Sequence, residues 1–326
     1  MPLLNSTFVP PFWLRNGHAQ TILPVLLPRR VPLRFRRERL ELPDGDFVDL
    51  DWADAGKSNH LAIITHGLEG GTDAKYIRGM AAALNAVGWG ALAWSFRGCS
   101  GEPNRLARFY HSGDTGDLGA VIAHAAAGYA SIALVGFSLG GNVILKYLGE
   151  GKVHASVVGG AAICAPVDLA SSARKLDSLP KNRVYLQRFL ASLVNKVEAK
   201  AARYPQEFDL RGIRAIRSFQ EFDDRYTAPL HGFRDAADYW SQASSKPYLT
   251  SIKAPALLVN SRNDPFLAPE CYPWIEAKEN PNFFLETPES GGHVGFLDLK
   301  NGLQPWSERR VVGFFREKVE DYANSS

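Results

Sequence analysis

Ser138 is the residue in this chain whose surroundings best suit covalent chemistry. It lies in GFSLG (136–140), which matches the G-x-S-x-G pattern of a nucleophile placed on a sharp turn. An apolar run precedes the turn, and apolar residues at helical spacing follow it. The two glycines remove side chains where strand and helix crowd together, so the serine can adopt a strained backbone with its hydroxyl exposed. The sequence therefore predicts a strand, a tight turn and a helix over Ser131–Lys146.

Two residues further along the chain complete the set that a serine nucleophile needs. A serine hydroxyl becomes nucleophilic when a base takes its proton, and an acid holds that base in one tautomer. Asp264, in SRNDPF, and His293, in ESGGHVGF, each follow a predicted strand. The C-terminal ends of parallel strands share one edge of a sheet, and the chain order Ser, Asp, His is known for this arrangement. We predict a triad of Ser138, Asp264 and His293.

The sequence offers other acids for the same role. Asp168, in CAPVDL, follows an earlier predicted strand and could reach the same imidazole from the neighbouring strand end. Asp223 and Asp224 are further carboxylates, for which salt bridges to nearby arginines are the simpler role. We prefer Asp264 as the acid and keep Asp168 as the alternative.

The loop HGLEGG (66–71) can supply part of an oxyanion hole. A developing oxyanion needs preorganised N–H donors. We predict that these are the backbone N–H of Leu139, which follows the serine, and the N–H of Leu68 in this loop. The His66 ring is expected to order the loop by hydrogen bonding, and Glu69 either faces the site or points to solvent.

These residues require a sheet whose strands end at one rim. Strand and helix patterns alternate regularly along the sequence, as they do in a parallel sheet covered on both faces. The alternating FVDLDWAD (47–54) predicts a half-exposed strand near a sheet edge. Besides the strand before Ser138, the further predicted strands are 61–65, 91–94, 156–165, 255–260 and 283–287, and the predicted helices are 74–86, 114–127, 269–278 and 307–322.

The alternation stops over residues 168–250. Residues 186–204 form a clear amphipathic helix pattern there, and a second helix is predicted around 236–243. A helical block inserted between two strands is suited to cover the C-terminal strand ends as a lid. We predict an α/β fold with a mostly parallel central sheet, helices on both faces and an inserted helical lid. The predicted divisions are an N-terminal arm (1–45), a core (46–167 and 251–326) and the lid (168–250).

Composition and charge narrow the class of protein. The 326 residues are 45% hydrophobic and 22% charged, which allows a sizeable core, and the net charge of +3 gives no reason to expect a nucleic-acid partner. Three cysteines without a CxxC pair indicate reduced thiols in a cytosolic compartment, and no metal or cofactor motif is present. No run approaches the ~18–20 apolar residues of a membrane span, and the N-terminus lacks a signal-peptide pattern. We expect a soluble, cytoplasmic protein.

The predicted N-terminal arm is basic. Residues 1–45 carry a net charge of +4 and show no helical or strand period before Leu40. One interpretation is a solvated arm packed on the domain by Phe8, Phe12 and Trp13. The other is a peripheral patch that contacts anionic lipid surfaces through its arginines.

Longer blocks of the sequence carry a family resemblance. The segments GFSLGGN, HGLEGG, NDPF and GGHVGF resemble the α/β-hydrolase superfamily. Within it, the chain resembles the YheT-like branch of esterases through RNGHAQTILP (15–24), FRGCSGEPNR (96–105), YHSGDTGDL (110–118) and FDDRYTAPLHGF (222–233). The resemblance implies a serine hydrolase with its triad at Ser138, Asp264 and His293 and without a cofactor. Eukaryotic relatives of this branch include lipid esterases and alcohol acyltransferases.

The residues and the resemblance together predict a carboxylic-ester hydrolase. Phe137, Val294 and Phe296, beside the serine and the histidine, are expected to bind substrate in an apolar acyl pocket, together with one face of helix 186–204. This pocket predicts small-molecule acyl esters of short to medium chain length as substrates. Two alternatives stay open: an alcohol acyltransferase that uses the same acyl-enzyme, and a non-catalytic lipid-binding scaffold on the same fold.

Overall fold

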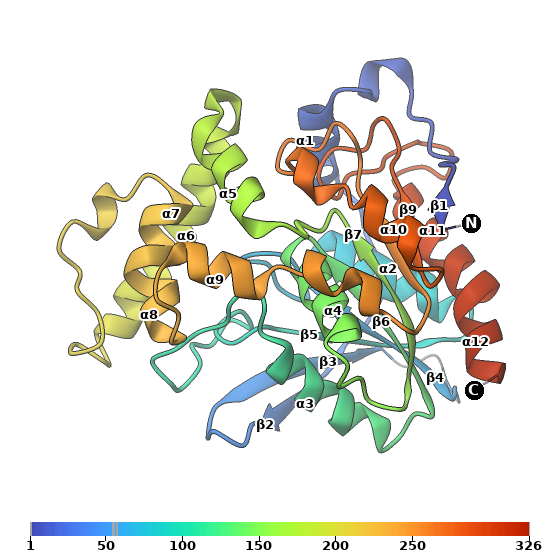
Figure 1. The fold of residues 1–326 in the computed structure, drawn as a ribbon. Coiled ribbons are helices and arrows are strands. Elements are labelled where there is room, and N and C mark those ends of the chain that lie inside the picture. Colours follow the sequence, from blue (N-terminus) through green and yellow to red (C-terminus); the bar gives the residue numbers. More distant parts are fainter. Residues whose placement is uncertain (1, 54–55, 57, 326) are drawn as a thin grey trace.

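A nine-stranded sheet forms the centre of the molecule (Figure 1). The computed structural model describes residues 2–53, 56 and 58–325, with side chains described as far as residue 323. The strand order across the sheet is β1-β9-β8-β7-β6-β4-β5-β3-β2. The strands are β1 (Leu3–Leu4), β2 (Arg36–Glu41), β3 (Phe47–Ala53), β4 (His60–Thr65), β5 (Gly90–Trp94), β6 (Ser131–Phe137), β7 (Val157–Ile163), β8 (Ala256–Val259) and β9 (Phe283–Glu286).

Most of the sheet is parallel. Neighbouring strands are parallel through the series β1, β9, β8, β7, β6, β4 and β5. The strand β3 pairs antiparallel with both β5 and β2. Strands that are covered on both faces read as continuous apolar runs, and β4 and β6 are buried runs of this kind. The predicted α/β fold with a mostly parallel sheet is confirmed.

Helices connect the strands and cover the sheet. The α-helices are α1 (Gly17–Leu26), α2 (Lys75–Asn85), α3 (Thr115–Ala126), α4 (Leu139–Gly149), α5 (Leu169–Ser178), α6 (Arg183–Ala201), α7 (Phe219–Phe222), α8 (Ala228–Leu230), α9 (Ala236–Ala243), α10 (Trp274–Glu279), α11 (Trp306–Phe314) and α12 (Glu320–Ser325). The short 3-10 segments are η1 (Phe12–Leu14), η2 (Pro180–Asn182), η3 (Ile213–Ala215), η5 (Lys246–Ser251) and η6 (Pro269–Cys271), and the π segments are η4 (Asp223–Thr227) and η7 (Phe315–Val319).

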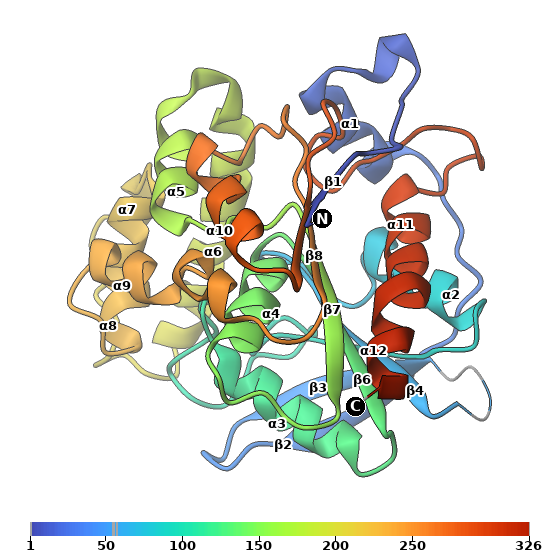
Figure 2. The ribbon, with the colours of Figure 1, turned by 45° about the vertical axis from the view of Figure 1, so that its right-hand side comes forward.

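Each face of the sheet has its own hydrophobic cluster. On one face, α3, α4 and α10 contribute buried residues such as Val121, Ile144 and Ala277. On the other face, α2 and α11 contribute buried residues such as Met80 and Phe314. Figure 2 shows α2, α11 and α12 on one side of the sheet and α4 and α10 on the other. The core therefore lies in two layers that hold the strands, and the strand ends, in fixed positions.

The chain between β7 and β8 forms a separate group of helices. Helices α5 to α9 share a third hydrophobic cluster, which also takes in Phe109 and Phe266 from loops of the core. This group stands beside the sheet at the left of Figure 1. Its position between two strands agrees with the expected helical insertion, while the division into arm, core and lid stays a prediction.

The prediction that the strand beginning at residue 47 is half exposed is wrong. β3 is buried along its whole length, and the edge of the sheet is β2. Arg37 of β2 binds Asp51 of β3 at 2.7 Å, and Arg39 binds Asp49 at 2.8 Å. Because these arginines pair with the carboxylates of β3, that strand can carry acidic residues and still be covered.

The N-terminal arm has more regular structure than its sequence pattern predicts. β1, η1, α1 and β2 all lie within the first 41 residues. Phe8 is buried as expected, but Phe12 is 81% exposed and Trp13 is 57% exposed. The prediction that these two residues pack the arm onto the domain is therefore wrong. No helix within the described residues is long and apolar enough to span a bilayer.

Candidate active site

The turn around Ser138 has the predicted geometry. β6 leads into this residue and α4 follows it. Ser138 has φ 52° and ψ −120°, which is a strained conformation for a residue with a side chain. A Cβ at Gly136 would lie 2.3 Å from the Gly140 oxygen, and a Cβ at Gly140 would lie 2.5 Å from the Thr65 oxygen. Both positions therefore require glycine if strand and helix are to meet at this turn.

The structure brings the three predicted triad residues together. His293 Nε2 lies 2.8 Å from Ser138 Oγ, and His293 Nδ1 lies 2.8 Å from Asp264 Oδ2. The buried Asp264 also accepts a hydrogen bond from the Phe266 N–H at 2.8 Å. An ionised carboxylate only accepts, so His293 carries its proton on Nδ1 and offers Nε2 as acceptor to the serine hydroxyl. This is the arrangement in which an imidazole can take a proton from serine.

The other candidate acids lie elsewhere. Asp168 accepts a hydrogen bond from the Ser171 N–H at 2.9 Å and caps the N-terminus of α5. Asp224 accepts one from the Ala236 N–H at 2.7 Å. In the part of the chain that the structure describes, neither Asp223 nor Asp224 forms an ion pair with an arginine. The salt-bridge prediction for these two residues is therefore wrong, because backbone and neutral side-chain donors occupy their oxygens.

The arm holds the loop that carries His293. The His293 N–H donates to Thr21 Oγ1 of α1 at 2.9 Å. The Gln20 side chain makes two bonds with the Leu297 backbone, donating to its oxygen at 3.0 Å and accepting from its N–H at 2.9 Å. A Cβ at Gly292 would lie 2.4 Å from the Gly17 oxygen. Sequence reasoning about the triad missed these α1 residues, although they lie in the family block RNGHAQTILP.

The predicted oxyanion donors lie next to the serine. Within the described residues, the N–H groups of Leu68 and Leu139 have no hydrogen-bond acceptor. His66 Nδ1 lies 2.7 Å from the Gly67 oxygen, and its Nε2 accepts from the Phe96 N–H at 3.2 Å. Burial lowers the pKa of His66 to about 4, so the ring is neutral and Nδ1 donates to the loop. His66 thus orders this loop, as the sequence predicts.

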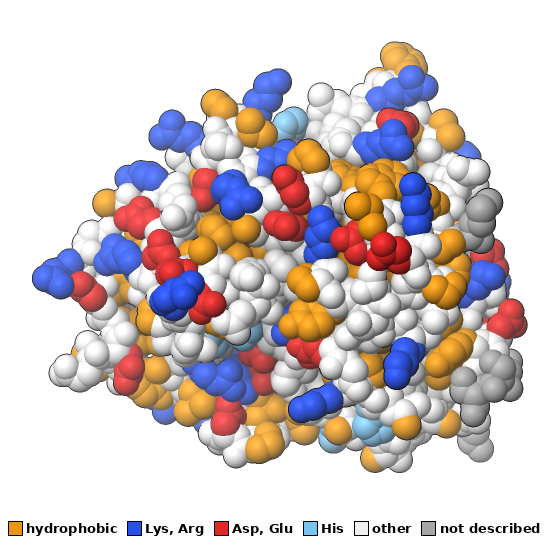
Figure 3. Space-filling view, viewed as in Figure 1, with side chains coloured by type: hydrophobic (Ala, Val, Ile, Leu, Met, Phe, Trp, Pro, Cys, Tyr) orange, Lys and Arg blue, Asp and Glu red, His pale blue; other side chains and the backbone are white. Residues whose placement is uncertain are grey.

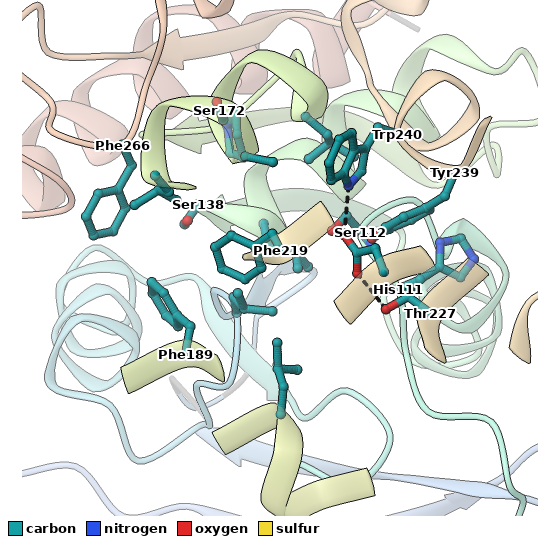
Figure 4. Close-up of a pocket in the computed structure, with 18 of the residues that line it drawn as sticks. His111, Ser112, Ser138, Ser172, Phe189, Phe219, Thr227, Tyr239, Trp240 and Phe266 are labelled. Atoms are coloured by element: carbon teal, nitrogen blue, oxygen red, sulfur yellow. Dashed lines mark hydrogen bonds between the residues drawn. The ribbon is translucent and has the colours of Figure 1, made fainter. Parts of the chain in front are cut away.

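Ser138 and His293 lie in the wall of a cavity (Figure 4). Its unfilled space is about 830 Å³ including the open mouth. Leu68 and Leu139 also line it. The remaining apolar lining comes mainly from loops of the core and from the helical group, namely Phe109, Pro166, Leu169, Ala173, Leu176, Phe189, Leu193, Phe219, Phe266 and Leu267.

The predicted substrate-binding residues are not among those that line this cavity. Phe137, Val294 and Phe296 all pack in the hydrophobic cluster on the opposite face of the sheet. The Phe137 ring lies 4.8 Å from that of Tyr76, and the Phe296 ring lies 5.8 Å from that of Trp306. The prediction that these residues bind substrate is therefore corrected. They are close in sequence to Ser138 and His293, but their side chains pack on the face of the sheet opposite the cavity.

Comparison with known proteins identifies the fold family. A profile described as alpha/beta hydrolase fold matches residues 63–298. The chain belongs to this family. The alpha/beta hydrolase chain is also 38% identical over 325 residues to "Putative esterase YheT" of Escherichia coli (strain K12), and the match covers 97% of this chain and 95% of that protein. The predicted YheT-like branch is therefore confirmed.

Two further similarities agree with this assignment. The human protein named "Phospholipase ABHD3" is 29% identical over 333 residues, and the match covers 98% of this chain and 80% of that protein. A solved structure of the Pyrococcus furiosus esterase Pf2001 superposes with a TM-score of 0.61 at 20% identity, covering 89% of this chain and 93% of that one. At that identity the superposition supports the alpha/beta hydrolase fold alone.

Glu69 ties the predicted oxyanion loop of this hydrolase fold to α6. Its side chain accepts hydrogen bonds from Tyr110 Oη at 2.8 Å, Ser192 Oγ at 2.6 Å and Lys196 Nζ at 2.6 Å. Burial would raise the pKa of Glu69, but the Lys196 charge and these hydrogen bonds outweigh burial and lower it. Glu69 therefore neither points to solvent nor faces the triad, and it fixes the position of the loop.

Cys164 forms hydrogen bonds with the backbone of the loop that carries His293. Its Sγ accepts a hydrogen bond from the Val294 N–H at 3.2 Å and donates to the Gly292 oxygen at 3.5 Å. Burial raises the pKa of this thiol well above its usual range, so it stays protonated. Its sulfur lies within 4.8 Å of ligand-type atoms of Asp264 and His293. We interpret these three side chains as a hydrogen-bonded group and not as a metal site, because the Asp264 carboxylate already binds His293 Nδ1.

The end of the cavity farthest from Ser138 is polar. Asp223 accepts hydrogen bonds from Thr227 Oγ1 at 2.6 Å and from Trp240 Nε1 at 2.8 Å (Figure 4). Burial raises the pKa of Asp223 to about 7. Burial also lowers the pKa of His111 and of His231 to about 3, so both rings are neutral at pH 7. The cavity thus joins the rim that carries Ser138 and His293 to a buried polar cluster.

Proposed function

We propose that this chain is a serine carboxylic-ester hydrolase that works through an acyl-enzyme on Ser138. The observation that carries the proposal is the hydrogen-bonded series from Ser138 through His293 to Asp264 at the wall of an apolar cavity. The esterase and phospholipase names of the two relatives support the same class of reaction.

The proposed reaction has two halves. Ser138 Oγ forms a bond to the ester carbonyl carbon while its proton passes to His293 Nε2, and Asp264 stabilises the imidazolium. The N–H groups of Leu68 and Leu139 stabilise the oxyanion, and such donors contribute about 2.7–4 kcal/mol each. His293 then gives the proton to the leaving alcohol. In the second half His293 takes a proton from water, whose oxygen forms a bond to the acyl carbon. The bond from that carbon to Ser138 Oγ then breaks, His293 returns the proton to Ser138 Oγ, and the acid leaves.

The lining of the cavity supports neutral acyl groups as substrates. Phe266 stands over the His293 ring at 4.2 Å, and Phe189 and Phe219 extend the apolar wall from α6 and α7. We propose short to medium acyl chains, and we propose that the helical group between β7 and β8 acts as the lid of this cavity. Charged substrates would lose hydration without gaining a partner at this wall.

An acyl ladder tests this proposal. Purified protein would be assayed with acetyl, hexanoyl and palmitoyl esters of one alcohol, and we expect the highest kcat/KM for the shorter chains. A fluorophosphonate should label Ser138, so Ser138→Ala should abolish labelling. Ser112→Ala, which changes a second serine in the cavity wall, should keep it.

Two results would contradict the proposal. A preference for charged or peptide substrates would reject the ester class, and an unlabelled wild-type protein would favour a non-catalytic scaffold. Added ethanol or glycerol in the same assay separates hydrolysis from transfer to an alcohol, because transfer produces a new ester in place of the free acid.

A further inference from the structure

Helix α1 has its polar side inward and its apolar side outward. Its only fully buried residue is Gln20, which binds the loop after His293. Ile22, Val25 and Leu26 lie on the outer side and are 43%, 56% and 69% exposed. A surface helix of a globular protein normally shows the opposite pattern. The outer side of α1 therefore needs an explanation other than folding of this chain.

The exposed apolar residues of the arm belong to two neighbouring segments, η1 with the residues before it and the outer side of α1, and together we call them the arm face. Eleven large hydrophobic side chains are exposed in the described residues, and six of them lie within the first 26 residues. Figure 3 shows hydrophobic side chains together with basic ones at the upper right tip, where the N-terminal segment, blue in Figure 1, stands. The arm face consists of Val9, Phe12, Trp13, Ile22, Val25 and Leu26.

Helix α1 is held firmly on the core although its outer side is exposed. Lys75 Nζ donates to the Val25 oxygen at 2.7 Å and to the Leu27 oxygen at 2.8 Å, and Asn263 Nδ2 donates to the Arg15 oxygen at 2.7 Å. A Cβ at Gly17 would lie 2.0 Å from the Asn263 oxygen, so α1 packs closely on the core. The inner side of the arm is thus fixed by polar and glycine contacts, and its apolar side chains stay available.

The segment that carries the arm face is positively charged. Residues 1–37 contain six arginines and no acidic residue. Arg15, Arg30 and Arg34 are exposed, and none of the three has a carboxylate partner in the part of the chain that the structure describes. The other arginines of the arm are already paired: Arg29 with Glu308, Arg36 with Glu38, Arg37 with Asp51 and Arg39 with Asp49.

We propose that the arm face docks on a lipid surface that carries anionic headgroups. Tryptophan and phenylalanine next to arginine are suited to the membrane interface, where rings enter the headgroup boundary and cations meet lipid phosphates. Apolar burial and electrostatic attraction then act together, and each arginine near an anionic surface contributes about 1 kcal/mol. Another protein would be expected to offer carboxylates to these arginines, whereas a bilayer offers both an apolar layer and phosphates in one plane.

The arm face lies next to the catalytic loop. Thr21, one residue before Ile22, accepts the His293 N–H. His18 contacts Tyr185 of α6 through Nδ1 and Oη at 3.1 Å, and the Tyr185 ring lies 4.9 Å from that of Phe266 in the cavity wall. Docking would therefore hold the lipid surface beside the cavity, so that substrates dissolved in lipid can enter it.

Vesicle binding tests the proposal on the full chain. The protein would be sedimented with vesicles of phosphatidylcholine alone and of phosphatidylcholine mixed with phosphatidylglycerol. We expect binding to the mixed vesicles, and we expect Phe12→Ser/Trp13→Ser to lower the partition constant about tenfold or more, since two exposed rings lose their apolar contact. Arg15→Gln/Arg30→Gln should lower binding to the mixed vesicles by a similar factor and leave binding to neutral vesicles unchanged.

The controls keep the result interpretable. Trp274→Ser/Ile275→Ser changes a matched exposed pair on α10, which lies below α1 in Figures 1 and 2, and it should bind like the wild type. Equal loss in this control, or wild-type binding by Phe12→Ser/Trp13→Ser, would overturn the proposal. A wild-type dimer in light scattering that the Phe12→Ser/Trp13→Ser change dissociates would overturn it in favour of a second copy as the occupant.

Docking and catalysis can be separated. Phe12→Ser/Trp13→Ser should hydrolyse a water-soluble hexanoyl ester at the wild-type rate and should lose rate only on an ester carried in mixed vesicles, a readout that rests on the proposed function. Ser138→Ala should bind the vesicles fully. If no soluble ester is hydrolysed while vesicles are bound, the proposed function fails and the docking surface stands.

Discussion

The two ends of the cavity are built by different means. At the rim, backbone contacts decide the geometry, because Gly136 and Gly140 let a strand and a helix approach and place Ser138 at φ 52°. At the far end, side chains decide it, because Asp223 is fixed by hydrogen bonds from Thr227 and Trp240 on the helical group. Figure 4 shows Ser138 and Phe266 on one side and this polar cluster on the other.

The difference teaches where chemistry and stability reside in this molecule. The rim holds the groups that we propose to react, and removing a reactive atom there should leave the packing intact. The far end holds buried polar groups in which removal of one partner leaves others unsatisfied, at a cost in stability of about 1–3 kcal/mol for each group. Substitutions at the two ends should therefore separate activity from stability.

The largest expected effect is loss of the nucleophile or the base. Ser138→Ala and His293→Ala should each reduce kcat toward background, by about 10⁶-fold, because the triad acts as a unit. The double substitution should lose little more than either single one. Steady-state kinetics measure this, and urea unfolding should show little change for Ser138→Ala. Additive losses in the double variant would show that the two residues act independently.

The choice of acid gives the next largest effect. Asp264→Asn should lower kcat by about 10⁴-fold, because an amide no longer holds His293 in the required tautomer. Asp168→Asn should change kcat little, since asparagine also caps a helix well. The same assay compares both variants. A larger loss for Asp168→Asn would show that the hydrogen bond at 2.8 Å from His293 to Asp264 is not the one that matters.

A substitution at the far end should act on stability. Asp223→Leu leaves the Thr227 hydroxyl and the Trp240 N–H buried without an acceptor, so the free energy of unfolding should fall by about 2–4 kcal/mol. kcat on a short ester should change much less than in the rim variants. Urea unfolding with kinetics on the same sample measures both. A catalytic loss as large as that of Ser138→Ala would erase the contrast between the two ends.

The effect that is smallest over any single pH unit is a pH dependence that belongs to Asp223. Its pKa is raised from 3.8 to about 7 in the folded chain, so between these values the folded state binds more protons than the unfolded state. Its stabilising contribution is therefore present below pH 3.8 and is lost as pH rises to 7. The stability difference between wild type and Asp223→Asn should fall with rising pH, at most by about 1.4 kcal/mol per pH unit. Unfolding curves at several pH values measure it, and a constant difference would contradict the raised pKa.

The geometry of the rim could be predicted from the sequence because it depends on short motifs and on the order of strands and loops. A strand that ends in GFSLG, and two others followed by Asp264 and His293, bring three side chains to one edge by sheet topology alone. The same logic predicted Leu139 and Leu68 beside the serine. It failed for Phe137, since nearness in sequence does not tell which face of the sheet a side chain takes.

The far end and the arm could not be read in this way. The partners of Asp223 depend on how helices of the insertion pack, and Trp240 is distant from it in sequence. Helix α1 escaped prediction because it is short and contains Pro24, a residue that normally ends a helical pattern. Its signal was the family block that contains Gln20 and Thr21, and that block gave no indication of the contact with the His293 loop.

The bond between Thr21 and His293 bears on where this enzyme can be trimmed. The alpha/beta hydrolase profile matches only from residue 63, after the whole N-terminal arm, so the profile alone would suggest an excision there. Such a cut would take away the clamp on the proposed general base and expose the glycine-rich bend that it braces. The profile marks the shared fold, while the geometry of the His293 loop also depends on α1, which precedes the matched range.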